Sequence, residues 1–599
     1  MTAFTTRPEL RGTFGMVAST HWLASAAGMA MLERGGNAFD AVVAAGFVLQ
    51  VVEPHLNGPG GEVPILLHDA GRRLTRVLCG QGVAPQAATI DRYRDLGLDR
   101  VPGNGLLSTV VPGAFDAWMV LLRDHGTLGL ADVLEPAIGY AETGYPVVGG
   151  ITAAVTSVAD LFRDHWPSSA AIYLPAGRAP QPGMLARNAP LAAMYKRLLA
   201  DSLVSAPNRE AAIEAARRHW SQGFVAEEID RFCRTQLVMD SSGRAHGGVL
   251  TGDDMVGWQA TYEQPISMDY YGLQVCKTGP WGQGPVFLQQ LALLRDYDLG
   301  ALDPLGDAFV HLVVEAAKLA FADREAFYGD PDFVDVPLDV LLSADYADHR
   351  RALIDDRAGT ELRPGHAHGI TPYIMDDLLE SDIDTADGLG DPTLAPAVPI
   401  AAPGDTCHVD VVDQWGNMVS ATPSGGWLQS SPIIPELGFC LNSRAQMFWL
   451  DPKAPSALGP GRRPRTTLTP TLVMRDGAAH LALGTPGGDG QDQWSLIAFL
   501  RHVHHGMNLQ EAIDAPTFHS RHFPSSFYPR ARAPAHVMIE NRFPQAARDG
   551  LARRGHVLEP AGDWALGRLA AVGIERHGRD RILKAGANPR LMQGYAAGR

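Results

Sequence analysis

A threonine at the start of a predicted β-hairpin is the residue with the clearest chemical potential in this chain. Thr406 is followed by Cys407 and His408, and residues 409–413 then alternate in the manner of a buried strand. Residues 414–422 have the composition of a turn followed by a returning strand. The sequence therefore predicts a hydroxyl group at the beginning of a strand.

The position of Thr406 in the chain decides whether its hydroxyl can act as a nucleophile. Inside a chain the alcohol is protonated at neutral pH and has no base attached to it. At a new chain terminus the free α-amine, with a reference pKa near ~8, can accept the hydroxyl proton within the same residue. Cleavage between Asp405 and Thr406 would create such a terminus.

The two residues after Thr406 offer alternative interpretations. Cleavage one bond later would expose Cys407 as an N-terminal nucleophile. His408 follows Thr406 by two residues, so on a strand it would point the same way and could act as the base of a triad. A structural role for His408 is the other interpretation.

A glycine-rich turn supplies a second chemical element. Residues 472–483 form a predicted hairpin with an Asp-Gly turn, and Gly487 and Gly488 then precede a predicted helix that begins before Trp494. Glycines between a strand and a helix expose backbone N–H groups at the positive end of the helix dipole. The pattern suits an oxyanion hole, and a capping turn without a substrate is the alternative.

The elements that position these residues are predicted to be helices packed on sheets. Residues 22–34 have helical spacing, and residues 40–52 form an almost wholly apolar helix that must be covered on both sides. Strands are predicted at 65–67 and 77–78 and as a pair within 265–275. Two further helices are predicted at the positions 286–296 and 308–327.

Composition limits the classes of function. The chain has 599 residues, 46% of them apolar, enough for a large core in one compact, multilayer body. A formal net charge of −16 argues against nucleic acid and against an anionic membrane surface as partners. A small molecule is the expected partner, and five scattered cysteines make a disulfide framework or a zinc site improbable.

Targeting signals are not predicted. Residues 1–10 contain charges and a proline where a secretory signal needs an apolar core, and no run approaches the ~18 apolar residues of a membrane span. A cytoplasmic location is the expectation.

Acidic and histidine-containing segments raise the question of a metal. Residues 359–405 lose periodicity and contain six acidic residues within 376–387. A solvated acidic loop that moves aside after cleavage is favoured over a metal site. The histidines at 366, 368, 502, 504 and 505 have spacings seen among metal ligands, but solvated histidines are favoured, and no metal is predicted.

Taken together, the motifs resemble the γ-glutamyltransferase (γ-glutamyltranspeptidase) family of N-terminal-nucleophile hydrolases. The matching segments run in order through nearly the whole chain: 35–38, 58–61, 406–413, 463–471 and 484–488. The resemblance implies an α+β fold, the four-layer αββα sandwich, with self-cleavage before Thr406. It implies a large subunit of residues 1–405 and a small subunit of 406–599, and no metal or organic cofactor. The assembly state, including a homodimer of such heterodimers, stays open.

The resemblance also implies roles for individual residues. Thr406 is the expected nucleophile, with its own amine as base, which disfavours Cys407 and leaves His408 structural. Ser424 provides a second hydroxyl near the terminal amine, and Gly487 and Gly488 are the expected oxyanion donors. Two threonines, Thr466 and Thr467, replace a serine pair that binds the substrate carboxylate; without the resemblance they would be ordinary strand-start residues.

Several substrate contacts of the family are changed in this sequence. Gln81 stands where an arginine is expected, and Gly426 and the next residue, Trp427, fall where an asparagine is expected. Arg444 and Met447 stand where the family has a Gln and then an Asp that takes the α-ammonium of a glutamyl group. Methionine cannot pair with an ammonium, and arginine would repel it. Arg444 is expected instead to receive a carboxylate at the far end of the acyl group, or else to be a surface arginine in a salt bridge.

A loop and a tryptophan could each form part of the wall of a substrate pocket or have a purely structural role. The loop 58–61 is either a plain turn or part of the substrate wall, and Trp281 is either an apolar wall or a core aromatic.

The predicted function is hydrolysis, or acyl transfer, of small anionic amides whose acyl group lacks the α-amino group, such as glutaryl-type or oxamate-type amides. A conventional glutathione hydrolase or γ-glutamyltransferase is the alternative within the enzyme class. An unprocessed, non-catalytic binding protein with the same fold is the alternative of another class.

Overall fold

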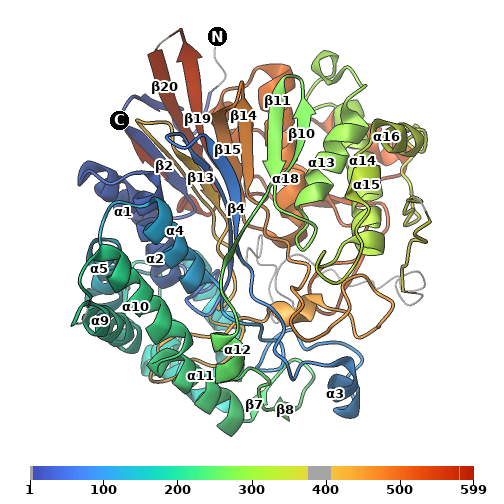
Figure 1. Ribbon diagram of the computed structural model, residues 1–599. Helices are drawn as coiled ribbons and strands as arrows, with labels where there is room; N and C mark the ends of the chain where they lie inside the picture. The colour runs from blue at the N-terminus through green and yellow to red at the C-terminus, as the bar shows by residue number, and fades with distance from the viewer. Residues whose placement is uncertain (1–3, 205, 368, 376–405, 579) are drawn as a thin grey trace.

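Two seven-stranded antiparallel sheets form the centre of the molecule (Figure 1). The computed structural model describes residues 4–204, 206–367, 369–375, 406–578 and 580–599. Sheet I has the order β21 (Tyr595–Gly598), β2 (Gly15–Ser19), β12 (Val409–Asp413), β13 (Met418–Ala421), β3 (Val63–Asp69), β4 (Leu74–Gly80) and β9 (Thr261–Glu263). Sheet II has the order β1 (Leu10–Gly12), β20 (Asp580–Ala587), β19 (Ala570–His577), β15 (Ala478–Gly484), β14 (Thr471–Arg475), β11 (Leu273–Lys277) and β10 (Ile266–Tyr270).

Helices cover the outer face of each sheet, on opposite sides of the molecule in Figure 1. The main helices on the side of sheet I are α1 (Trp22–Glu33), α2 (Ala38–Val52), α4 (Ala114–His125), α5 (Leu130–Thr143), α9 (Ala189–Val204), α10 (Arg209–Ser221) and α11 (Phe224–Thr235). The main helices on the side of sheet II are α13 (Gly284–Leu294), α14 (Asp307–Phe327), α18 (Gln491–His505), α19 (Leu509–Asp514) and α20 (Gln545–Arg554). The order of layers is therefore helix, sheet, sheet, helix, as predicted.

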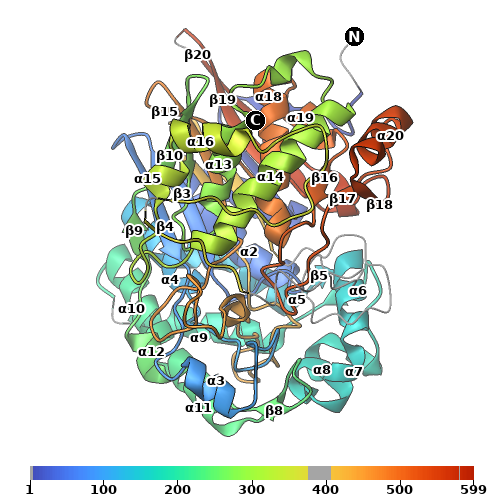
Figure 2. The same ribbon diagram turned by 90° about the vertical axis from the view of Figure 1, so that its right-hand side faces the viewer.

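Shorter elements connect these layers. The remaining helices are α3 (Ile90–Asp95), α6 (Gly149–Ser157), α7 (Ala159–Asp164), α8 (Pro167–Tyr173), α12 (Gly252–Val256), α15 (Leu338–Leu341) and α16 (Ala344–Arg351). A small sheet of β16 (Phe518–Ser520), β17 (His536–Ile539) and β18 (Val557–Pro560) lies near α14 and α20, as the second view shows (Figure 2). Two two-stranded ladders pair β5 (Tyr145–Pro146) with β6 (Leu185–Ala186), and β7 (Val238–Met239) with β8 (Ala245–His246).

Alternation along β12 assigns its side chains to two different cores. Val409 and Val411 belong to the core between sheet I and the helices, whereas Val412 belongs to the core between the two sheets. Successive side chains of a strand point to opposite faces. Both faces of β12 are therefore buried, which explains why valines occupy both faces of the strand.

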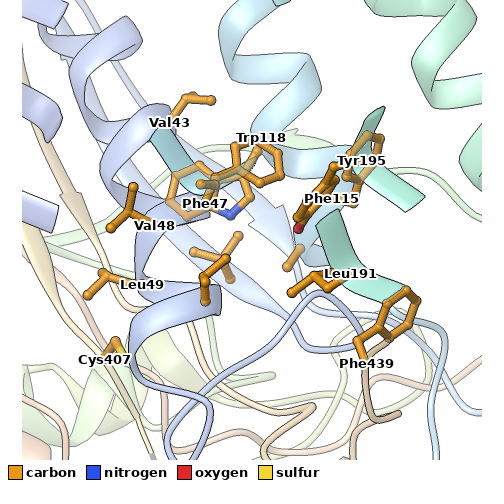
Figure 3. Packing of buried hydrophobic residues seen from close by; sticks show 14 of the residues in the cluster. Val43, Phe47, Val48, Leu49, Phe115, Trp118, Leu191, Tyr195, Cys407 and Phe439 are labelled. Atoms are coloured by element: carbon orange, nitrogen blue, oxygen red, sulfur yellow. The ribbon is translucent and has the colours of Figure 1, made fainter. Parts of the chain in front are cut away.

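Helix α2 shows how the sequence builds the layer behind this strand. Asn37 and Asp40 form a capping box at its N-terminus, and every residue of the helix is buried. Gly46 leaves room for the Trp118 ring, because a Cβ atom there would lie 2.5 Å from that ring. Figure 3 shows this packing, with Phe47 and Trp118 at its centre. An apolar helix of this kind is stable only as an interior layer.

Both sheets mix strands from before and after Thr406. Sheet I places β12 between β2 and β13, and sheet II places β14 between β11 and β15. After a cut before Thr406, the strands that precede it, such as β2 and β11, would stay hydrogen-bonded to the strands that follow it, such as β12 and β14. The predicted subunits, 1–405 and 406–599, would be one folded body.

The elements predicted around the chemical residues are present. The hairpin after Thr406 is β12 and β13, and the Asp-Gly hairpin is β14 and β15. The predicted helix 286–296 begins two residues earlier, at Gly284, because Pro285 is favourable in a first turn. The acidic residues 376–387 and Asp405 lie outside the described residues. Within the described part of the chain, no helix has the length and apolar character needed to span a bilayer.

Candidate active site

Thr406 lies fully buried at the edge of the β12–β13 hairpin. It forms an antiparallel bridge with Ser424, and Cys407 N–H donates to the Pro423 carbonyl at 2.9 Å. This makes Thr406 and Ser424 a directly opposed pair, and their Oγ atoms are 3.2 Å apart. Opposed side chains lie on the same face of a sheet. The structure thus brings together the two hydroxyls that the sequence predicted to cooperate.

Arg444 contacts the second of these hydroxyls. Its Nη2 donates to Ser424 Oγ at 2.8 Å, and its Nε donates to Glu62 Oε1 at 2.6 Å. The remaining arm, Nη1, contacts Met447 Sδ at 3.7 Å. Arg444 forms a salt bridge with Glu62. Because it is only 1% exposed, it is not a surface residue. Whether it also receives a substrate carboxylate stays a prediction.

Cys407 points away from Thr406, into the helical side of sheet I. Its Sγ contacts Glu53 Oε2 at 3.0 Å, and it belongs to the same core as Val48 and Leu49 of α2 (Figure 3). Burial, followed by the nearby Glu53 carboxyl, raises the pKa of the Cys407 thiol well above its usual value. A buried, protonated thiol on the opposite face is a poor nucleophile for this site.

His408 points to the same face as Thr406 but its ring is held by other partners. Nδ1 is 2.9 Å from Thr422 Oγ1, and Nε2 is 2.9 Å from Asp410 Oδ2. Burial raises the pKa of Asp410, and the neighbouring imidazole opposes that shift. The ring also fills the space above Gly484, where a Cβ atom would lie 2.3 Å from it. These contacts fit a structural role, which joins the two sheets beneath the nucleophile.

A polar cluster behind the strand fixes the backbone of Thr406. Arg568 Nη2 lies 3.4 Å from the Thr406 carbonyl oxygen, and Arg568 N–H donates to Thr485 Oγ1 at 2.8 Å. Glu53 accepts a hydrogen bond from Thr20 at 2.6 Å. Burial raises the pKa of Glu53, and the positive charge of Arg568 opposes it. The cluster connects Thr406 to the end of β15, where the glycine-rich turn begins.

The turn after β15 needs glycine at both predicted oxyanion positions. Gly487 has a φ of 121° and Gly488 a φ of 52°. A Cβ atom would lie 2.2 Å from the Trp494 ring at Gly487 and 2.9 Å from Phe527 at Gly488. Within the described part of the chain, neither N–H group donates a hydrogen bond. N–H groups without a partner at such a turn are available for an anionic oxygen.

Asp489 anchors this turn, and sequence reasoning missed it. Its carboxylate accepts hydrogen bonds from Ser526 N–H at 2.8 Å and Ser526 Oγ at 2.6 Å, and pairs with Arg324 of α14. Burial acts to raise the pKa of Asp489, but Arg324 and Ser526 outweigh it and hold the pKa below its usual value. Its position directly after Gly488 was the one available signal.

The first turn of α18 has a second buried ion pair. Asp492 Oδ1 is 3.0 Å from Lys277 Nζ, and both side chains are fully buried. Burial raises the pKa of Asp492 to about 6, although Lys277 opposes the shift. The pair connects α18 to β11, the strand that adjoins β14.

The predicted carboxylate-binding threonines lie beside the turn. Gln283 N–H donates to the Thr466 carbonyl at 3.0 Å, and Gln283 Nε2 lies 3.4 Å from the Gly488 carbonyl oxygen. Thr467 is buried, and its Oγ1 has no hydrogen-bond partner among the described residues. Gln81 is also buried; its Nε2 donates to the Gly82 carbonyl, and its Oε1 has no described partner. Such orphaned polar atoms are candidates for substrate contact.

Two of the positions that differ from the family pattern, Trp427 and Met447, lie in a small apolar cluster. Trp427, Met447 and Phe527 pack together, all nearly inaccessible to solvent. The Trp427 ring lies 5.4 Å from the Arg444 guanidinium, and Phe527 reaches Gly488. This cluster therefore extends from the hydroxyl pair to the glycine turn.

The loop 58–61 and Trp281, each with two possible roles, lie in different parts of the molecule. Gly58 N–H donates to the Gly425 carbonyl at 2.8 Å, and a Cβ atom at Gly61 would lie 2.0 Å from the Ser424 carbonyl oxygen. The loop 58–61 thus lies directly against the Ser424 strand, where Gly426 continues with a φ of 64°. Trp281 belongs to the core between the sheets, as a core aromatic would.

One group of metal-ligand types occurs among the described residues. His311, Glu315 and His556 offer atoms within 4.8 Å of one another. However, Lys318 Nζ lies 2.6 Å from Glu315 Oε1, and the two imidazoles hydrogen-bond each other at 2.8 Å. An ammonium at the carboxylate opposes a divalent cation, so these contacts are those of a structural network.

Comparison with known proteins agrees with the geometry. The chain is 31% identical over 583 residues to the glutathione hydrolase-like YwrD proenzyme of Bacillus subtilis (strain 168), covering 97% of each. It is 33% identical over 560 residues to the acylase ACY 1 proenzyme of Pseudomonas sp. (strain SE83), covering 91% of this chain and 87% of that one.

Solved structures of similar proteins have the same fold over nearly the whole chain. The chain of "Structure of LmbA2991T421A" is 55% identical, with a TM-score of 0.93 and full coverage of both chains. The cephalosporin acylase from Bacillus halodurans is 28% identical, with a TM-score of 0.81 over 99% of this chain and 97% of that one. The family model for gamma-glutamyltranspeptidase matches residues 24–598. The chain therefore belongs to the gamma-glutamyltranspeptidase family.

Proposed function

We propose that this protein is an N-terminal threonine amidohydrolase that acts on small anionic amides whose acyl group lacks an α-ammonium. The proposal includes maturation by self-cleavage between Asp405 and Thr406, which yields subunits of residues 1–405 and 406–599. The proenzyme names of two relatives support maturation by cleavage. The buried pair of hydroxyls at Thr406 and Ser424 supports the chemistry, as do the N–H groups of Gly487 and Gly488, which have no described partner.

The proposed reaction follows from these groups. After cleavage, the Thr406 α-amine accepts the Oγ–H proton while Oγ attacks the amide carbonyl carbon. The N–H groups of Gly487 and Gly488 stabilise the negative oxygen, an effect worth roughly 10²–10³ in rate for each donor. The proton passes to the leaving nitrogen as the C–N bond breaks, and a threonyl ester remains. Water, or an acceptor amine, then resolves this acyl-enzyme.

The observation that carries the choice of acyl group is the packing of Met447. Its side chain is buried against Trp427 and Phe527 and contacts Arg444 at 3.7 Å. The Glu62 carboxylate is already paired with Arg444. An incoming ammonium would therefore lose its water shell and gain an apolar neighbour and a guanidinium. A glutaryl-type or oxamate-type acyl group avoids this cost.

The substrate carboxylate has two candidate partners in this proposal. Thr467 Oγ1 is buried without a described partner, and Thr466 lies next to it beside Gly488. Arg444 Nη1, whose described polar contact is a sulfur atom, is a cationic donor at the other end of the site. Gln81 and Gly426 are the remaining proposed contacts. The chemistry needs no metal or organic cofactor, because amine, hydroxyl and N–H groups supply each step.

A pair of anilides tests the proposal. Release of the aniline from a glutaryl anilide is expected to be much faster than from the γ-glutamyl anilide, which differs only by the α-ammonium. A faster γ-glutamyl reaction would instead identify a conventional glutathione hydrolase or transferase. The same protein is run on a denaturing gel. A single intact band after long incubation, without turnover of either anilide, would identify a non-catalytic binding protein.

A further inference from the structure

Three residues from three neighbouring strand segments form a row across sheet I. Ser424 N–H donates to the Glu62 carbonyl at 3.0 Å, and Glu62 N–H donates to the Ser424 carbonyl at 2.9 Å. On its other side Ser424 opposes Thr406. Directly opposed residues in antiparallel pairs share a face. The side chains of Glu62, Ser424 and Thr406 therefore point the same way in one line.

Arg444 joins the first two members of this row. Its Nε donates to Glu62 Oε1 at 2.6 Å and its Nη2 to Ser424 Oγ at 2.8 Å. The position of the guanidinium is fixed further, because Arg444 N–H donates to Asn442 Oδ1 at 3.2 Å and its plane lies near the Trp427 ring. A planar, always protonated group held on two sides can adopt few other orientations.

The direction of these hydrogen bonds follows from their chemistry. A guanidinium only donates, so Ser424 Oγ must accept from Arg444. This contact polarises the serine hydroxyl and makes its own O–H a better donor toward Thr406 Oγ1, 3.2 Å away. The hydrogen of the Thr406 hydroxyl is then left to point at the amine that must remove it.

We propose that Glu62 and Arg444 are positioning residues for the nucleophile: Glu62 fixes Arg444, and Arg444 orients the Ser424 hydroxyl so that it donates to Thr406 Oγ1. This inference rests on the proposed function, because it assigns these residues to an N-terminal threonine. Glu62 directly follows the loop 58–61, and its carboxylate lies over Gly425, where a Cβ atom would be 2.6 Å from it. The glycine-rich loop thus places a negative charge beside Ser424.

Single substitutions in the pair should shift the pH profile in opposite directions. In Arg444→Met the Glu62 carboxylate is left near the Thr406 amine, so the acid limb of kcat/KM should move to higher pH. In Glu62→Gln the guanidinium is left, so the limb should move to lower pH. Each shift is expected to be at most about one pH unit, the low end of the range for a nearby charge, because Ser424 lies between Glu62 and Thr406 in the row. The double variant, neutral at both positions, should return toward the wild-type profile.

Other charged or titratable groups around Thr406 stay constant in this comparison, and on its own face these are His408 and Asp410, which contact each other at 2.9 Å. Arg568 lies 3.4 Å from the Thr406 carbonyl, and Glu53 lies beneath Cys407. Burial, and secondarily the charge of Arg568, lowers the pKa of His55, so that ring is neutral. The wild type and the three variants share these groups. A purely structural role for the pair would lower activity in both single variants without moving the two limbs apart.

Chemical rescue provides a second, independent readout. Arg444→Ala should lose about 100-fold in kcat, the loss of one charge-assisted hydrogen bond. Added guanidinium at low millimolar concentration should restore much of it, and urea, a neutral molecule of the same shape, should not. Arg444→Lys keeps the charge but not the fork, so its kcat should fall while its acid limb stays in place. Circular dichroism checks that each variant folds.

The outcomes separate this inference from the proposed function. If wild-type protein is cleaved at Thr406 and turns over a glutaryl anilide, the proposed function stands on its own. Parallel limb shifts, or equal effects of guanidinium and urea, would then overturn the role of Glu62 and Arg444 alone. If Arg444→Ala is not cleaved and remains a single band, guanidinium is added and cleavage is followed on a denaturing gel. Failure of guanidinium to restore cleavage counts against the inference.

Discussion

Replacement of Asp489 by asparagine tests whether the glycine turn is catalytic. Asp489 accepts two hydrogen bonds from Ser526, at 2.8 and 2.6 Å, and a charge-assisted bond from Arg324. The side chain of asparagine has nearly the same shape: its carbonyl oxygen in the place of Oδ2 can still accept from Ser526 N–H, and its NH₂ group in the place of Oδ1 can donate to Ser526 Oγ. The substitution therefore removes the ionic contact with Arg324 and keeps the local packing.

The magnitude follows from what Arg324 retains. Its Nη2 still donates to Glu325 at 2.7 Å and to the Pro524 carbonyl at 3.1 Å, so its charge is not left unpaired. The loss is then one charge-assisted hydrogen bond, about 1.5–3 kcal/mol. If this free energy no longer holds the Gly487–Gly488 turn in place and is added to the activation barrier, kcat falls about 10–100-fold. KM should change little, because the oxyanion forms only on the way to the transition state.

The assay is anilide release by fully cleaved protein, with kcat and KM measured separately. Asp323→Asn is the matched control. Asp323 lies on α14 and, like Asp489, is buried; it pairs with Arg350 at 3.3 Å and accepts from Gly365 N–H at 2.8 Å. It makes no described contact with the turn. A kcat for Asp489→Asn within twofold of wild type, or a loss no larger than that of the control, would show that Asp489 does not hold the turn in a catalytic position.

Further expectations concern the other groups of the site. Thr467→Val should raise KM about tenfold with kcat unchanged, since one hydrogen bond to substrate is lost; Thr517→Val, which also removes a buried hydroxyl without a described partner, should leave KM unchanged. Cys407→Ala should still be cleaved before Thr406 and keep kcat within a few-fold, because the thiol faces the helices; loss of both would revive a cysteine nucleophile. The pKa of Asp489 is lower in the folded state than the usual 3.8, so its contribution to stability is complete above pH 4 and is lost as pH falls through the folded value. Thermal midpoints below pH 4 should therefore decline more steeply for wild type than for Asp489→Asn, and equal slopes would contradict the assigned ion pair.

The sequence was sufficient to predict the framework of the site. Local signals carried that information: alternation over 409–413 gave the hairpin, the Asp-Gly turn gave β14 and β15, and the apolar helix at 40–52 required cover on both sides. The resemblance to a family then added the αββα order, which local patterns could not supply. Burial on both faces of β12 explains why Val412 follows Val411 directly and departs from strict alternation.

The charged contacts were not predictable from the sequence. Glu62 and Arg444 are 382 positions apart, and neither has a local pattern that identifies its partner. The interpretation of Arg444 as a surface arginine was therefore wrong about burial, since only the fold shows that it lies inside. Asp489 and Arg324, 165 positions apart, were missed for the same reason. The roles proposed for Thr466, Thr467, Gln81 and Gly426 stay predictions.

Mass spectrometry of the incubated protein shows whether Thr406 becomes an N-terminal nucleophile. We expect two fragments, residues 1–405 and 406–599, with Thr406 as the first residue of the smaller one, and a Thr406→Ala variant that stays intact and inactive. A break at another bond, or a variant that still cleaves itself and turns over amides, would contradict this expectation.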